Sequence, residues 1–158
     1  NAGQPMGITP FGMRAMMSLR LDRFFGSWLS EFSPDYTAAE TGMDRFISFK
    51  KNTDFIGRAA AEAERANPPA RMSVVFEVDA DDADVVAYEP VFIDGEVRGF
   101  CTSGGFSHHA GKSIALALIP RGEAADNLEV EIEIMGQRRR AKRIMTPLFD
   151  PEGVAMRG

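Results

Sequence analysis

A strict alternation of apolar and acidic residues near the end of the chain most constrains its fold. In the stretch NLEVEIEIMGQRRRAKRIM, apolar residues from 128 to 134 alternate with three glutamates, and a basic run follows at residues 137–143. Alternation with a period of two is typical of a β-strand that buries one face. The sequence therefore predicts a β-hairpin with Met135-Gly136 as its turn. Its register is set by opposite charges in the pairs Glu133–Arg138, Glu131–Arg140 and Glu129–Lys142.

That register also explains most of the basic run, which we interpret as the solvated outer face of one strand rather than an anion or partner site. Further strands precede the hairpin. Residues 72–78 alternate, and residues 91–103 predict a second hairpin with Asp94-Gly95 as its turn. The apolar residues 113–119 favour a buried strand. We expect the strand before them to end near Ser103, with a polar turn between the two.

Helix signals dominate the start of the chain. Thr9-Pro10 is typical of a helix start, and apolar residues at helical spacing predict an amphipathic helix over residues 11–25. Gly26 is the expected stop. Asp54 is the expected cap of a second, alanine-rich helix over residues 55–66, which ends at Asn-Pro-Pro.

Between these helices we expect a polar loop at residues 33–42 and a short strand at residues 45–50. The predicted fold is thus α+β: a short helix and strand segment, then a small antiparallel β-barrel of about six strands. The prolines near residue 68 mark a boundary, which divides the chain into domains at 1–68 and 69–158.

Composition excludes several classes of protein. A net charge of −5 disfavours nucleic-acid binding, and no apolar run approaches the roughly 20 residues of a membrane-spanning helix. The single cysteine excludes an internal disulfide and fits a reducing compartment. Because the N-terminal residues also lack a signal-peptide pattern, we expect a cytoplasmic protein.

Residues 101–112 (CTSGGFSHHAGK) look chemically rich. His108-His109 is either a metal ligand pair or, more simply, a polar loop tip, because adjacent residues of an extended chain point in opposite directions. Cys101 with His108 is either a nucleophile with its base or a small buried apolar residue. Lys112 is either a rim charge or an anion contact. We predict no metal site.

Five segments, in order, resemble the C-terminal part of the aminomethyltransferase family. They are MSLRLDRFFGSW, SPDYTAAETGMDRF, DFIGRAA, FCTSGGFSHHAGKSIALALIP and the closing hairpin. The resemblance extends from about Gly3 to Leu148. The family includes the glycine-cleavage T-protein and the folate-binding halves of dimethylglycine and sarcosine dehydrogenases. RFFGSW and PDYT look more like the flavin-linked dehydrogenase branch.

The resemblance implies tetrahydrofolate-dependent one-carbon transfer from an N-methyl or aminomethyl donor. It implies a three-lobed ring with folate in the central hole, and, in the dehydrogenase branch, an FAD domain outside this chain. The family's catalytic aspartate lies in upstream lobes of the same polypeptide. We therefore assign no catalytic residue to the chain, and expect folate, an N-methylated amine and those upstream lobes as its partners.

By the same resemblance, Arg20, Phe25, Trp28 and Glu40 form the expected folate-binding set. Met16 stands where glycine-cleavage members have a ligand-contacting arginine. Three of the four assignments have a structural alternative: a salt bridge for Arg20, and core packing for the two aromatic residues. A rival hypothesis is that the barrel is a non-catalytic structural or protein-interaction module.

Overall fold

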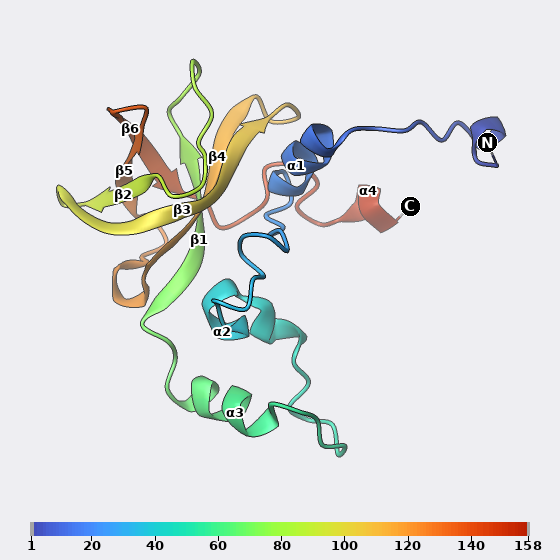
Figure 1. The fold of residues 1–158 in the computed structure, drawn as a ribbon, viewed down its shortest axis with the longest axis vertical. Coiled ribbons are helices and arrows are strands. Elements are labelled where there is room, and N and C mark those ends of the chain that lie inside the picture. Colours follow the sequence, from blue (N-terminus) through green and yellow to red (C-terminus); the bar gives the residue numbers. More distant parts are fainter. Residues whose placement is uncertain (1, 158) are drawn as a thin grey trace.

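The computed structural model describes residues 2–157, so Asn1 and Gly158, the outer limits of the two expected domains, lie outside it. Figure 1 shows a β-barrel with the N-terminal half of the chain beside it and below it. The barrel is closed and antiparallel, in the order β1-β4-β3-β2-β5-β6. The strands are β1 (Arg71–Val78), β2 (Pro90–Ile93), β3 (Glu96–Ser107), β4 (Lys112–Pro120), β5 (Glu129–Ile134) and β6 (Gln137–Arg143). The prediction of a six-stranded antiparallel barrel is confirmed.

The terminal hairpin has the predicted register, with all three glutamates opposite the expected basic residues. Its turn residues, Met135 and Gly136, both have positive φ, as a tight two-residue hairpin turn requires. Arg138 stands opposite Glu133, but its ion pair is with the diagonal neighbour Glu131. The distance from Nη1 of Arg138 to Oε2 of Glu131 is 3.3 Å. Arg139 does not share the outer face, because it stands opposite the buried Ile132 on the alternate face of the strand. Its guanidinium lies 2.8 Å from Asp82.

Strand β4 is buried on both faces, which explains its unbroken apolar sequence. Its residues Ala115, Ala117 and Ile119 belong to the barrel core. The alternate residues Ile114 and Leu116 form a second apolar cluster outside the barrel with Leu21. Leu21 comes from the first α-helix, α1 (Met13–Leu21), which packs beside β3 (Figure 1). The N-terminal half is therefore attached to the barrel through this outer cluster.

The helix predicted over residues 11–25 is wrong in its extent. Gly12 is the N-cap of α1 and Asp22 is its C-cap. Phe24 has a φ of 59°, which is incompatible with a right-handed helix, so the helix cannot extend to residue 25. Most of the apolar residues used for that prediction are exposed, and Leu21 is the one that the helix buries. Helical spacing therefore located the helix but not the face that packs.

Three other predictions in this half are corrected. Residues 45–50 form no strand: the 3-10 helix η2 (Met43–Phe46) occupies their start, and closure of the barrel leaves no free edge to pair with. The loop at 33–42 contains a short helix, α2 (Ala38–Thr41), which begins with a capping box that we overlooked. The next helix, α3 (Arg58–Ala66), has Gly57 rather than Asp54 as its N-cap. It ends at Ala66 as predicted, with Asn67 as its C-cap.

The remaining short helices are η1 (Gln4–Met6), η3 (Arg121–Glu123) and α4 (Val154–Arg157). Strand β3 does not end near Ser103, because it continues through both glycines to Ser107. The turn between β3 and β4 is therefore shorter than predicted, and it carries the two histidines as expected. Within residues 2–157, no helix is both long and apolar enough to cross a membrane.

Candidate ligand-binding site

A buried carboxylate anchors the loop that follows α1 to the barrel. This segment, residues 22–31, is called the 22–31 loop below. Glu31 is only 2% exposed, and it accepts hydrogen bonds from the hydroxyls of Thr102, at 2.6 Å, and of Ser103. Its second oxygen accepts from the backbone N–H of Ser27 at 2.8 Å. A carboxylate this deeply buried must be paired, so Glu31 fixes the loop against β3.

Arg20 completes the anchor from the side of α1. Its Nη1 lies 3.7 Å from Oε2 of Glu31 and donates to the carbonyl of Phe25 at 2.9 Å. Burial lowers the pKa of Arg20, and the negative charge of Glu31 opposes that shift. Arg20 therefore makes the salt bridge that was the structural alternative for it, and it also holds the backbone of Phe25.

The two aromatic side chains of the predicted set stand out from this anchored backbone. Phe25 is 41% exposed and Trp28 is 77% exposed. The backbone N–H of Phe25 donates to the carbonyl of Arg20 at 2.9 Å, so the loop is hydrogen-bonded while its rings remain accessible. Neither ring belongs to the buried core, which was the structural alternative for both.

Glu40 lies away from this loop, in α2. Its Oε2 accepts from the backbone N–H of Thr37 at 3.0 Å, which closes the capping box. Its Oε1 accepts two hydrogen bonds from Arg71, at 3.1 and 2.9 Å. Both carboxylate oxygens of Glu40 are thus engaged within the chain, and they join α2 to the first strand of the barrel.

The structure thus brings three of the four predicted residues together, on the end of α1 and the 22–31 loop. Sequence reasoning missed Glu31 and the role of Thr102-Ser103 as its hydrogen-bond donors. Glu31 has no local pattern that reveals its burial, because its hydroxyl partners on β3 lie more than 70 positions away. The one sequence signal for a polar partner at this position was the adjacent pair of hydroxyl residues, Thr102 and Ser103, at the start of the polar stretch.

The thiol and the lysine of that polar stretch have structural surroundings. Burial raises the pKa of the Cys101 thiol to about 12, so the thiol is not a nucleophile at neutral pH. Lys112 makes a 2.7 Å ion pair with Glu77, which favours the rim charge over the anion contact. Within residues 2–157, no three histidine, cysteine, aspartate or glutamate side chains gather in a metal-binding group.

Gly104 is required by a close backbone contact rather than by chemistry. A Cβ at this position would lie 2.4 Å from the Cβ of Val85 and 2.7 Å from its carbonyl oxygen. We expect Gly104→Ala to lower the free energy of unfolding by about 1–3 kcal/mol, because backbone must move to make room. Urea unfolding measures this loss. Gly122→Ala, where a Cβ meets nothing within 4 Å, is the control and should change stability little.

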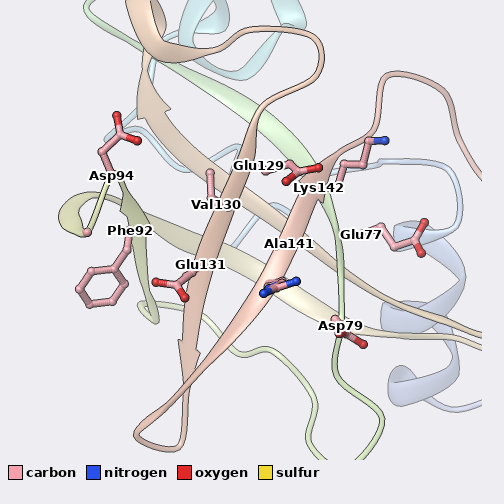
Figure 2. A pocket seen from close by; sticks show the side chains of 11 residues that line it. Glu77, Asp79, Phe92, Asp94, Glu129, Val130, Glu131, Ala141 and Lys142 are labelled. Atoms are coloured by element: carbon pink, nitrogen blue, oxygen red, sulfur yellow. The ribbon is translucent and has the colours of Figure 1, made fainter.

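A groove of about 720 Å³ lies elsewhere, along β1, β2, β5 and β6. Figure 2 shows acidic side chains around it, with Lys142 among them. Five carboxylates and two basic side chains line the groove: Glu77, Asp79, Asp94, Glu129, Glu131, Arg140 and Lys142. This excess of negative charge disfavours an anionic ligand. Four of these charges, on Glu129, Glu131, Arg140 and Lys142, belong to the cross-strand pattern that fixes the register of the β5–β6 hairpin.

Two family models match the chain. The Glycine cleavage T-protein C-terminal barrel domain matches residues 71–150, and the GCVT N-terminal domain matches residues 1–51. The crystal structure of glycine cleavage system aminomethyltransferase T from Bartonella henselae superposes with a TM-score of 0.80. It covers 89% of this chain and 39% of its own, at 22% identity, and so supports the fold.

Curated relatives match nearly the whole chain. Dimethylglycine dehydrogenase, mitochondrial, from Rattus norvegicus is 37% identical over 148 residues, which are 94% of this chain and 17% of the relative. Aminomethyltransferase from Symbiobacterium thermophilum is 34% identical over 148 residues, 94% of this chain and 39% of the relative. The chain therefore spans less than half the length of these relatives. It belongs to the glycine cleavage T-protein family, and its six-stranded barrel is the C-terminal barrel domain of that family.

Proposed function

We propose that the chain is the C-terminal portion of a tetrahydrofolate-dependent, aminomethyltransferase-like enzyme within a flavin-dependent demethylating dehydrogenase. The observation that carries this proposal is the 37% identity to a dimethylglycine dehydrogenase across 94% of the chain. The substrate is a one-carbon donor of the N-methyl or aminomethyl class. The family resemblance further suggests that FAD is bound by another part of the polypeptide, outside this chain.

The proposed folate-binding residues are Arg20, Phe25, Trp28 and Glu40, and their contacts divide the roles among them. The exposed rings of Phe25 and Trp28 fit the flat face of a pterin or aminobenzoyl group. Arg20 is engaged with the carbonyl of Phe25, so it holds the backbone of the 22–31 loop. Glu40 is engaged with Arg71 and Thr37, so its proposed role is to hold α2 against β1. When bound, tetrahydrofolate supplies the nitrogen that accepts the one-carbon unit. The chain's own contribution is to orient the ligand and to exclude water.

Exposed apolar side chains support upstream lobes as the partner of the N-terminal half. Large hydrophobic residues are exposed along residues 6–56, and Leu29 and Ile56 are among the most exposed. A soluble domain rarely shows so much apolar surface unless another surface covers it. We propose that the upstream lobes of the same polypeptide cover it and supply the catalytic residue.

A cytoplasmic location stays a prediction, since the dehydrogenase relatives carry the word mitochondrial in their names.

Calorimetric titration with tetrahydrofolate tests the proposal. The longest natural polypeptide that contains these 158 residues should bind tetrahydrofolate, and Trp28→Ala should weaken binding about tenfold, because a stacked ring is lost. Phe46→Ala removes another exposed aromatic ring outside the 22–31 loop and should leave the affinity unchanged.

Absence of binding to the wild-type polypeptide would rule out the proposed function. Equal affinity of the Trp28 variant and the wild type would show that Trp28 is not part of the binding site. That result would leave the proposed function unchanged. The rival interaction-module hypothesis makes a different prediction: no folate affinity, with partner-dependent association in light scattering after size-exclusion chromatography.

A further inference from the structure

His109 makes a short contact with a buried carboxylate that the proposed ligand site does not use. Its Nδ1 lies 2.6 Å from Oδ2 of Asp22, which is only 1% exposed. Asp22 is the C-cap of α1 and the first residue of the 22–31 loop. Among the described residues, Oδ1 of Asp22 has no hydrogen-bond partner. His109 therefore supplies the one side-chain hydrogen bond that this carboxylate makes within the described chain.

The position of Asp22 makes that contact important. The C-terminal end of a helix carries partial negative charge, so a carboxylate there is unfavourable. Burial adds a second penalty, because a buried charge needs a partner. A residue of the β3–β4 turn meets that need, and it thereby ties the start of the 22–31 loop to the barrel at a second point, separate from Glu31.

One face of the imidazole is also covered. The ring of His109 stacks on Phe149, with 4.2 Å between ring centroids. The carbonyl of Phe149 accepts from Arg23 at 3.2 Å, and Arg23 lies 3.8 Å from Asp150. The side chain of His109 thus connects three segments: the β3–β4 turn, the end of α1 and the chain after β6.

We propose that His109 is a positioning residue: its hydrogen bond to Asp22 fixes the 22–31 loop and hence the rings of Phe25 and Trp28. The effect on ligand binding rests on the proposed function. The effect on the loop does not, since it follows from the contacts alone. As a positioning residue His109 acts through the loop, so its loss should weaken ligand affinity and leave the rate of transfer at saturating ligand unchanged.

Two substitutions separate the two contacts of the ring. His109→Phe keeps an aromatic ring for Phe149 and loses the hydrogen bond, while His109→Asn keeps a donor near Nδ1 and loses the stack. Hydrogen exchange measured on this chain should show the amides of the 22–31 loop exchanging about tenfold faster in the Phe variant. The Asn variant should stay within about twofold of wild type. His108→Asn, on the same turn, is the matched control.

Unchanged loop exchange in the Phe variant would overturn the proposal, and so would equal acceleration in both variants. A measurement on the wild type covers the case in which a variant does not fold: nitrogen-correlated NMR of the imidazole should show an Nδ1 proton protected from solvent exchange. An unprotected Nδ1 would also overturn it. Titration of the same variants with tetrahydrofolate then separates the two proposals. If the wild type binds no folate, the proposed function fails, while the exchange result still decides the role of His109.

Discussion

Replacing Glu31 by alanine will lower the free energy of unfolding by about 3–5 kcal/mol, the effect of removing one partner of a buried ion pair. The carboxylate neutralises Arg20 and accepts from two buried hydroxyls, Thr102 and Ser103. Alanine leaves the cation without its counter-charge and the two hydroxyls without this acceptor at the same time. Since the penalty of an unpaired buried charge exceeds the net gain from making the pair, the loss is large.

Chemical denaturation of this chain measures that loss. Glu31→Gln keeps an acceptor oxygen for the hydroxyls and removes the charge, so it should fall between alanine and wild type. Glu129→Gln, on the solvated face of the terminal hairpin, should change stability by less than about 1 kcal/mol. A loss of less than 1 kcal/mol in the alanine variant of Glu31 would show that the loop is not held in this way.

Phe76→Ala will also lower the free energy of unfolding by about 3–5 kcal/mol. Phe76 is fully buried in the barrel core. It lies on β1 between Ala115 of β4 and Arg143 of β6, where the barrel closes. The inward residues of β4 beside it are alanines, which are too small to fill the space that a lost phenyl ring would leave.

The same denaturation experiment tests this prediction. Val97→Ala, at an exposed position of β3, is the control and should lie within about 0.5 kcal/mol of wild type. If the Phe76 variant were as stable as the Val97 variant, the barrel interior would not be packed as described.

The barrel could be predicted from the sequence because its signals are local. Alternation, the two turn dipeptides and opposed charges each specify a strand or a register within a few residues. Strand β3 was underestimated because Gly104 and Gly105 suggest a turn, whereas Gly104 is needed where the chain passes against Val85. That contact joins two segments distant from one another in the sequence, so no local pattern contains it.

The candidate site was predictable only in part, for a related reason. The aromatic residues of the 22–31 loop came from the family resemblance, and the structure shows their rings exposed. Glu31 and His109 act through partners far away in the chain, on β3 and on α1. The apolar spacing of residues 11–25 suggested a packed face that this chain leaves largely exposed, as expected of a surface that upstream lobes cover.

The polar stretch at residues 101–112 therefore has a structural role. Its hydroxyls hold Glu31, one of its histidines holds Asp22, and its cysteine is part of the core. Together these contacts make the barrel a support for the loop that carries Phe25 and Trp28. In the proposed function, the barrel therefore acts on the ligand through the position of that loop.

Hydrogen exchange with and without tetrahydrofolate, on the longest natural polypeptide that contains this chain, tests this account most directly. We predict slower exchange at the amides of the 22–31 loop when tetrahydrofolate is present, and no change along β5 and β6, which line the acidic groove. Protection confined to the groove, with the loop unaffected, would contradict the account.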